Sequence, residues 1–326
     1  MLLSSGPLQG CTTADVVVVG AGFASLWFAY LASQRGFRVM VLDGEAPGYG
    51  ASGRNGGLMT GGLALSPRDA VQQWGEGLSV NLYRRVIRAH EAIRQAAAGG
   101  HGGERLEVGR MFGAAGGSYG VGDAEGECCL SRGSWISEPS VSGADLPGIL
   151  KHSWPGGLVY PSDGSWQPMK LVRWLVGAVE SRGGTVFGRS LVRDIREESG
   201  SVAVRTDRGQ AEADYAVLAV NASLGSTYSP LAAGVVPTRG QMLVSEPVDP
   251  LPYARAVSAD WGYLYWYQHV DGRIALGGFR NLDVDRESSN ELALNPRIQE
   301  VRDQWLSDRI IGRPVAWTTD GQGIYA

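Results

Sequence analysis

One stretch near the start of the chain, residues 16–43, constrains the fold more than any other part of the sequence. It reads VVVVGAGFASLWFAYLASQRGFRVMVLD. Residues 16–19 are a β-branched run, which is typical of a parallel strand buried on both faces. A glycine-containing turn and a helix-length segment follow, and residues 37–42 predict a second strand that ends before Asp43. The order of these segments predicts a β-α-β unit.

The turn of this unit has the pattern of a dinucleotide-binding site. Gly20 and Gly22 allow backbone N–H groups to approach a pyrophosphate at the N-terminus of the helix. The third glycine position of the pattern holds Ser25, slightly larger than the glycine or alanine usual there. Asp43 follows Gly22 by 21 residues, the separation expected of an acid that binds a ribose hydroxyl. A β-α-β unit without a nucleotide is the alternative, and this combination favours the dinucleotide site.

Length and composition exclude several classes of protein. A chain of 326 residues can bury a large core and is expected to form two domains. Its formal net charge is −4 and it has no basic stripe, so we expect no nucleic-acid partner. No apolar run reaches the roughly 18 residues of a membrane span, and the N-terminus does not resemble a signal peptide. We therefore expect a cytoplasmic protein.

The three cysteines, two of them adjacent at Cys128 and Cys129, predict neither a disulfide framework nor a metal site. The four histidines are scattered without a nucleophile at motif spacing, so each is interpreted as a surface or structural residue.

The rest of the chain predicts more of the first sheet and then a second one. Residues 44–62 form a glycine-rich loop, and the helix-start pair Ser66-Pro67 predicts one helix that runs to residue 99. A later helix is expected from Pro168. Strands are predicted at residues 185–187, 191–197, 202–206 and 216–220, the last of them apolar and fully buried.

From residue 235 the pattern changes to antiparallel, with strands at residues 241–246, 263–269 and 274–276, and a hairpin turn at 270–273. A helix is expected at 296–306. The fold class is therefore α/β, a lobe with a parallel sheet beside a lobe with an antiparallel sheet.

Several motifs occur in the order of a known family. They are the opening unit, ASGRNGG at 51–57, the segment 157–170, the strand end at 219–222, the hairpin with Gly277-Gly278, and residues 319–321. Together they resemble the FAD-dependent D-amino-acid oxidase superfamily, in particular the branch of γ-glutamylputrescine oxidase and the sarcosine- and glycine-oxidase-like enzymes. ASGRNGG is the most specific of these motifs.

The resemblance implies FAD as cofactor, and a set of binding positions. Gly20, Gly22 and Ser25 are implied at the pyrophosphate and Asp43 at the adenosine ribose, while residues 52–57 follow the stretch toward the flavin. The implied cofactor residues are Gly20, Gly22, Ser25, Asp43, Ser52, Arg54, Asn55, Gly56, Gly57, Val192 and Asn221. The implied substrate-binding residues are Tyr265, Tyr267 and Gln268, and no residue is assigned a catalytic role.

The resemblance also implies a division into domains. Residues 12–89, 157–229 and 301–326 are expected to form a discontinuous, Rossmann-like FAD-binding domain, and residues 90–156 and 230–300 a substrate domain. Two departures from the family stand out. Gln268 aligns where relatives often have an arginine, which would weaken pairing with a substrate carboxylate. Relatives also continue past residue 326 with a strand and a glycine-led helix that faces the flavin.

Three functions follow from these observations. The leading one is an oxidase that transfers a hydride from the α-carbon of a small amine or amino acid to flavin N5, after which the imine hydrolyses and O₂ gives H₂O₂. The second is a truncated flavoprotein, or one whose flavin site is completed by a second chain. The third is an NAD(P)-dependent dehydrogenase, which would explain residues 16–43 but not the ASGRNGG loop.

Overall fold

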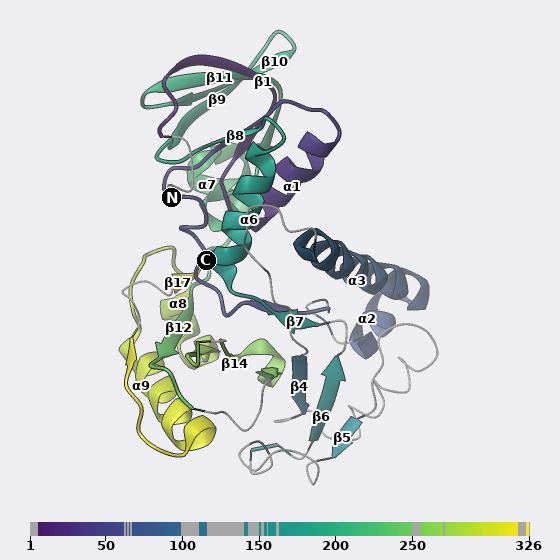
Figure 1. Cartoon of the computed structure of the whole chain (residues 1–326), viewed down its shortest axis with the longest axis vertical. Helices are drawn as coiled ribbons and strands as arrows, with labels where there is room; N and C mark the ends of the chain where they lie inside the picture. Colours follow the sequence, from purple (N-terminus) through teal and green to yellow (C-terminus); the bar gives the residue numbers. More distant parts are fainter. Residues whose placement is uncertain are drawn as a thin grey trace.

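The structure is a computed structural model. It describes residues 6–61, 63, 65, 67–98, 111–115, 140–142, 150, 153–154, 156–160, 163–249, 255–269, 271–318 and 324–325. Ser66, Cys128, Cys129, His101, His152, Val270 and residues 319–321, which the sequence singled out, lie outside these ranges. Two large sheets organise the molecule: Figure 1 shows the six-stranded sheet in the upper part and the nine-stranded sheet in the lower part.

The first sheet has the strand order β8-β2-β1-β11-β10-β9. The pairs β1–β2, β1–β11 and β2–β8 are parallel, whereas β9, β10 and β11 form an antiparallel meander. The strands are β1 Gly10–Val19, β2 Val39–Leu42, β8 Thr185–Phe187, β9 Val192–Glu198, β10 Ser201–Thr206 and β11 Gly209–Leu218. The predicted strands at 185–187, 191–197, 202–206 and 216–220 all lie in this sheet; the first three agree within a residue or two at each end, whereas the last is the end of β11, which begins seven residues earlier, at Gly209.

Strand β1 is buried on both faces, as its β-branched run predicted. Val16 and Val18 enter a core formed with α1 (Phe23–Gln34) and α6 (Pro168–Glu180). Val17 and Val19 enter a second core, closed by the β9–β10 meander and by Leu8. Figure 1 shows α1 and α6 side by side against this sheet. The side chains on the two faces of β1 thus contribute to both hydrophobic cores of this lobe.

Strand β11 departs from the expectation of full burial. Its residues 216–218 pair with β1 but are only half-buried. Its pairing with β10 ends at Ala213, so the antiparallel neighbour covers only the first part of the strand. An apolar run indicates that a strand can be buried. The length of the neighbouring strands decides how many of its residues are actually buried.

The predicted helix after Pro67 is two helices, α2 (Pro67–Trp74) and α3 (Glu76–Ala98). Gly75 separates them with a φ of +79°, a left-handed conformation that ends the first helix. The side chain of Ile93, on α3, packs into the core with α1 and α6. Residues 90–98, expected in the substrate domain, therefore contact the first lobe.

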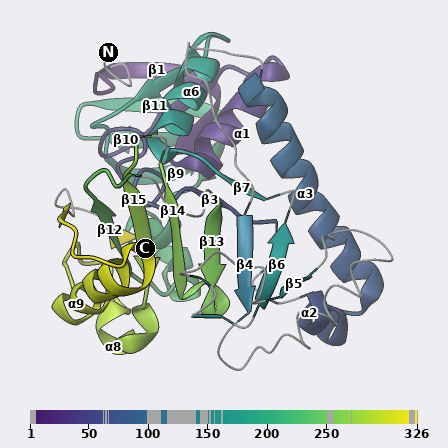
Figure 2. The ribbon, with the colours of Figure 1, turned by 60° about the horizontal axis from the view of Figure 1, so that its bottom comes forward.

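The second sheet has the order β16-β12-β15-β14-β13-β4-β6-β5, with β17 also paired to β12. Every pair is antiparallel except β13–β4. Its strands are β4 Met111–Ala115, β5 Ser140–Ser142, β6 Gly156–Tyr160, β12 Gly240–Ser245, β13 Ala256–Ala259, β14 Leu264–Gln268, β15 Ile274–Gly278, β16 Trp317–Thr318 and β17 Ile324–Tyr325. Figure 2 shows them side by side, with α3 along one flank.

The two faces of this sheet have different neighbours. One face, with Leu264 and Trp266 of β14, packs against Leu306 and Ile310. These two residues lie in the π-helical turn Leu306–Ile311, which continues α9 (Pro296–Trp305). The other face, with Tyr267 of β14, packs on Leu58 of the short strand β3 (Leu58–Met59), which follows the ASGRNGG loop. The glycine-rich loop therefore lies against the second sheet.

The C-terminal residues lie in a different place from the one expected. Residues 301–326 were assigned to the first lobe, but α9 packs on β12, and β16 and β17 both pair with β12. The reason is that α9 buries Ile298, Arg302 and the following Leu306 against the second sheet. An amphipathic pattern shows that a helix has a buried face, but does not show which sheet covers it.

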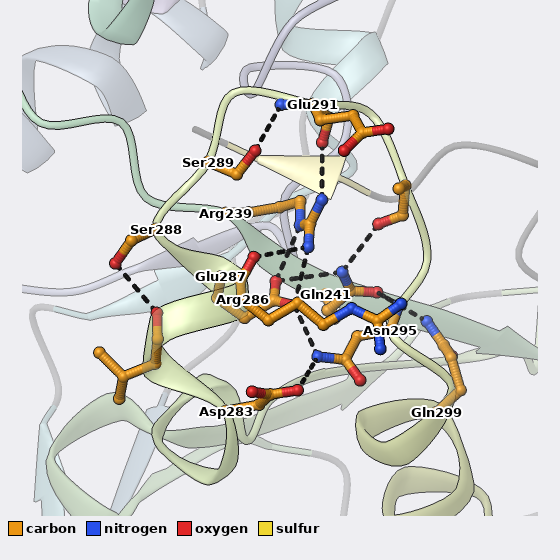
Figure 3. A network of polar contacts seen from close by, with 12 residues as sticks. Arg239, Gln241, Asp283, Arg286, Glu287, Ser288, Ser289, Glu291, Asn295 and Gln299 are labelled. Carbon is orange, nitrogen blue, oxygen red and sulfur yellow. Dashed lines mark hydrogen bonds and ion pairs between the residues drawn. The ribbon is translucent and has the colours of Figure 1, made fainter.

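A buried network of polar side chains joins α9 to this sheet (Figure 3). The fully buried carboxylate of Glu287, the last residue of α8 (Val284–Glu287), accepts two hydrogen bonds from the guanidinium of Arg239, at 3.0 and 3.1 Å. It also accepts bonds from the amides of Gln241 (3.1 Å) and Asn295 (2.8 Å). A carboxylate with this many donors is stabilised in its charged form despite its burial.

Among the described helices, none is both long enough and apolar enough to cross a membrane. The described residues also contain no cluster of three or more His, Cys, Asp or Glu side chains that could hold a metal ion.

We predict that Arg239→Met destabilises the protein by about 3–5 kcal/mol, because it leaves the buried Glu287 charge without its ion-pair partner. Urea unfolding followed by circular dichroism measures this loss. The matched control is Arg193→Met, since Arg193 makes a similar contact with Asp207 at 2.8 Å but both side chains are more than half exposed. Equal losses in the two variants would contradict a special role for the buried pair.

The same network predicts an acid-sensitive contribution to stability. Burial would raise the pKa of Glu287, but the bonds from Arg239, Asn295 and Gln241 outweigh it and hold this pKa below its ordinary value of 4.5. A carboxyl whose pKa is lowered on folding stabilises the folded state above its unfolded pKa, and that stability is lost as the pH falls through the folded pKa. The loss of unfolding free energy caused by Glu287→Gln should therefore be full at pH 7 and shrink below about pH 4.5. A loss that is constant from pH 7 to pH 3 would contradict this.

Candidate functional site

The carboxyl ends of β1, β2 and β11 meet at one edge of the first sheet. Gly20, directly after β1, has a φ of +99°, and a Cβ there would lie 2.6 Å from the carbonyl oxygen of Ala219. Only glycine fits this position without strain. Asn221, with a φ of +49°, begins a 3-10 turn just beyond β11 and keeps its side chain exposed. This edge is where parallel α/β sheets bind nucleotides.

Asp43 lies at the end of β2 and holds the glycine turn in place. Its Oδ2 accepts a bond from the N–H of Ala21 at 2.6 Å, and its Oδ1 accepts one from the N–H of Glu45 at 2.8 Å. Burial raises the pKa of Asp43, although the two backbone N–H groups oppose this. The carboxylate is thus fixed at the mouth of the turn.

Ser25 and Ser52 meet at the N-terminus of α1. The hydroxyl of Ser25 is fully buried and accepts a bond from the N–H of Gly22 at 3.1 Å. The hydroxyl of Ser52 accepts a bond from the N–H of Phe23 at 2.9 Å. Ser25 therefore replaces glycine without obstructing the turn, because it caps the helix from within. The bond from Phe23 to Ser52 places the 51–57 loop directly beside the glycine turn.

The 51–57 loop is clamped by Asn55. Its amide donates to the carbonyl of Ser52 at 2.7 Å and its Oδ1 accepts from the N–H of Gly57 at 2.8 Å. Gly57 has a φ of +70°, and a Cβ there would overlap the carbonyl oxygen of Trp166. Trp166 in turn donates its N–H to the carbonyl of Gly57 at 2.8 Å. Backbone contacts backbone at this point, which a side chain would prevent.

Tyr265 and Tyr267 of β14 close the other side of the loop. A Cβ on Gly56 would lie 2.8 Å from Cε2 of Tyr265. The hydroxyl of Tyr267 donates to the carbonyl of Trp166 at 2.8 Å. Both tyrosines therefore lie against the glycine-rich loop, and their expected role in binding the substrate stays a prediction. Trp166 itself was missed, because its contribution is made by the backbone and carries no sequence signal.

Gln268 does not join this group. Its amide donates to the carbonyls of Val248 (2.7 Å) and Gly272 (3.0 Å), which hold the hairpin after β14. Successive residues of a strand point to opposite faces, so Tyr265, Tyr267 and His269 share one face and Gln268 belongs to the other. The same alternation could have identified His269, which the sequence treated as structural: its Nδ1 lies 2.8 Å from the Tyr267 hydroxyl.

The remaining expected residues border the site. The side chain of Val192 is buried in the core of the β9–β10 meander, and Ser190 nearby donates its N–H to the carbonyl of Asp43 at 2.7 Å. The guanidinium of Arg54 lies 4.0 Å from the centre of the Tyr49 ring. Val192 thus follows a segment that is bonded to Asp43, and the expected roles of Val192 and Arg54 at the cofactor stay predictions.

Comparison with known proteins identifies relatives of the chain. The protein family described as FAD dependent oxidoreductase matches residues 15–318. The chain is 28% identical over 287 residues to the γ-glutamylputrescine oxidoreductase of Escherichia coli, covering 83% of this chain and 66% of that protein. The chain thus spans less than two thirds of the length of this curated relative.

Solved structures share the fold. Glycine oxidase from Geobacillus kaustophilus superposes with a TM-score of 0.71 at 16% identity, over 95% of this chain and 84% of that one. L-proline dehydrogenase from P. horikoshii gives a TM-score of 0.72, also at 16% identity, over 93% and 78%. At this identity the likeness concerns the architecture alone.

The residues of the site fit an FAD. Glycine at positions 20 and 22 keeps side chains away from the N-terminus of α1, where a pyrophosphate would bind, and the N–H groups of Gly22 and Phe23 there are bonded to the hydroxyls of Ser25 and Ser52. Asp43 is fixed at the ribose end, and the clamped loop leads from the turn to Tyr265. Glycines line this path where side chains would fill it.

We predict that Gly22→Val weakens FAD binding at least about tenfold, a loss of about 1.4 kcal/mol. A Cβ on Gly22 would lie 2.9 Å from Oγ of Ser52, and the branched side chain would block approach to the helix N-terminus. The ratio of flavin absorbance to protein after equilibrium dialysis against FAD measures this.

Gly50→Ala is the control, since Gly50 lies in the glycine-rich loop that follows the β-α-β unit and a Cβ there has no heavy atom within 4 Å. It should retain FAD as the wild type does. Full flavin occupancy in Gly22→Val would contradict the assigned pyrophosphate site.

Proposed function

The chain belongs to the family of FAD-dependent oxidoreductases, whose cofactor is FAD, and on this premise we propose that it oxidises a small amine or amino acid. The observation that carries the proposal is the contact of Tyr265 and Tyr267 with Gly56 and Gly57. The loop that begins beside the dinucleotide turn ends against a wall of the second sheet. A substrate held by that wall would lie beside the end of the loop path.

In the proposed reaction, the α-carbon of the substrate loses a hydride, the imine formed hydrolyses in water, and O₂ is reduced to H₂O₂. FAD, when bound, supplies the two-electron acceptor for this chemistry. The protein contributes position and environment. The buried aromatic wall excludes water, and the backbone contacts at Gly57 and Trp166 keep the loop rigid.

The charges around Tyr265 favour a substrate that carries a carboxylate. Burial raises the pKa of Tyr265, while the positive charges of Arg302 and Arg280 lower it in part. The hydroxyl therefore stays protonated at neutral pH and acts as a donor. A hydroxyl donor whose surroundings carry the positive charges of Arg302 and Arg280 favours an anionic partner. We therefore favour an amino acid over a simple amine.

The division of labour between the lobes is part of the proposal. We assign cofactor binding to residues 12–89 and 157–229, as expected from the sequence, and substrate binding to 90–156 and 230–300. The pairing of β16 with β12 supports assigning residues 301–318 to the substrate domain as well.

We predict that the purified protein, loaded with FAD, is reduced by at least one amine under anaerobic conditions and releases H₂O₂ when O₂ is admitted. Glycine, L-proline and γ-glutamylputrescine are suitable first substrates, because they are named in the similar proteins. Bleaching of the flavin absorbance measures the reduction.

The control tests the alternative function, an NAD(P)-dependent dehydrogenase, by measuring whether the protein oxidises NADH. Flavin that no amine bleaches, in a protein that holds FAD tightly, would contradict the amine-oxidising function and leave the cofactor assignment standing.

A further inference from the structure

We propose that His269 is the base that takes the proton from the substrate ammonium, and that Tyr267 positions it for this role. The inference rests on the proposed function, because oxidation at the α-carbon requires the neutral amine. In this step Nε2 of His269 accepts a proton from R–NH₃⁺, which gives an imidazolium and the free amine R–NH₂. No electrons are transferred in it.

The geometry around Tyr267 determines which nitrogen of His269 carries the proton. The Tyr267 hydroxyl lies 2.8 Å from the carbonyl oxygen of Trp166 and 2.8 Å from Nδ1 of His269. Burial raises the pKa of Tyr267 well above its ordinary value, so the hydroxyl keeps its single proton. A carbonyl can only accept, so that proton is directed to Trp166. Nδ1 must therefore be the donor toward Tyr267.

This assignment leaves Nε2 as the basic nitrogen of a neutral imidazole. Among the described residues, Nε2 has no hydrogen-bond partner. The buried polar atoms that lack a partner in the described residues do not include Nε2. His269 lies on the same face of the hairpin strand as Tyr265 and Tyr267. This face contacts Gly56 and Gly57. The free nitrogen thus belongs to the face that carries the proposed substrate site.

The charged groups near the ring leave it neutral at physiological pH. Burial lowers the pKa of His269, Asp271 opposes this and Arg273 adds to it. Asp271 and Arg273 pair with each other at 2.7 Å, so their fields largely cancel at the ring. On its own strand the ring meets Tyr267, and through the Tyr267 hydroxyl it is linked to the uncharged carbonyl of Trp166. A neutral base is ready to accept a proton.

The ring is also held rigidly. It packs on the ring of Tyr267 with the ring centres 4.4 Å apart and the ring planes tilted by 50°, and the backbone N–H of His269 donates to the carbonyl of Arg273 at 2.7 Å. A base held from both sides keeps one orientation, which proton transfer requires. Tyr267 thereby acts on the reaction through His269.

The first experiment uses no substrate. ¹⁵N NMR of imidazole-labelled protein reports the protonated nitrogen of each of the four histidines, and His269→Asn identifies the signal of His269. We expect the Nδ1–H form in the wild type and a mixture of forms in Tyr267→Phe. A wild-type ring protonated at Nε2 would overturn the assignment.

The second experiment follows flavin reduction against pH with glycine, L-proline or γ-glutamylputrescine. His269→Asn is the matched variant, because its amide can still donate to Tyr267 from the position of Nδ1 but cannot accept a proton. We expect the wild-type rate to fall in acid as Nε2 becomes protonated. In the variant the acid limb should move from the pKa of His269 to that of the substrate amine, so that the rate is about 10²–10⁴-fold lower near neutral pH and recovers as the free amine accumulates at alkaline pH.

The outcomes separate the two proposals. Reduction of the wild type with an unchanged acid limb in His269→Asn would overturn the role of His269 alone. A wild type that holds FAD but is reduced by none of the amines would overturn the proposed function, and this role with it. A uniform loss of rate at every pH in the variant would indicate a structural role and would also overturn the proposal.

Discussion

The site depends on one contact in which backbone meets backbone, at Gly57 and Trp166. The N–H of Trp166 donates to the carbonyl of Gly57, and the carbonyl of Trp166 lies where a Cβ of residue 57 would be. The contact requires a left-handed glycine, and a residue with a side chain would push the two segments apart. Because the Trp166 carbonyl also accepts the Tyr267 hydroxyl, this contact joins the glycine-rich loop to the second sheet.

The side chains of β14 point alternately to the two faces of the second sheet, and the two faces have different roles. Leu264 and Trp266 of β14 anchor it to the core under α9, and Tyr265 and Tyr267 face the loop. The buried Arg239–Glu287 network stabilises the side of the sheet at which α9 packs. The polar groups that hold the lobe together are thus distinct from those that face the site. Substitutions in one set are expected to leave the other in place.

Much of the site could be predicted because it is local in sequence. The glycine turn, Ser25, Asp43 and residues 52–57 depend on short-range patterns of strand, turn and helix, and the structure places them side by side. Gln268 was expected at the site but binds the hairpin carbonyls, and His269 was overlooked. Both follow from the period of a strand, which assigns faces only when its register against the neighbouring loop is known.

By itself, the sequence determined the β-α-β unit, the strands of the first sheet and three strands of the second, β12, β14 and β15, since these depend on backbone conformations that neighbouring residues impose. Only the tertiary structure decided which sheet received α9, how far β11 was buried, and that the carbonyl of Trp166 meets Tyr267. These features depend on contacts between residues far apart in the chain. An amphipathic helix or an apolar strand specifies that a face is buried, whereas the partner that covers it is chosen by the packing of the whole molecule.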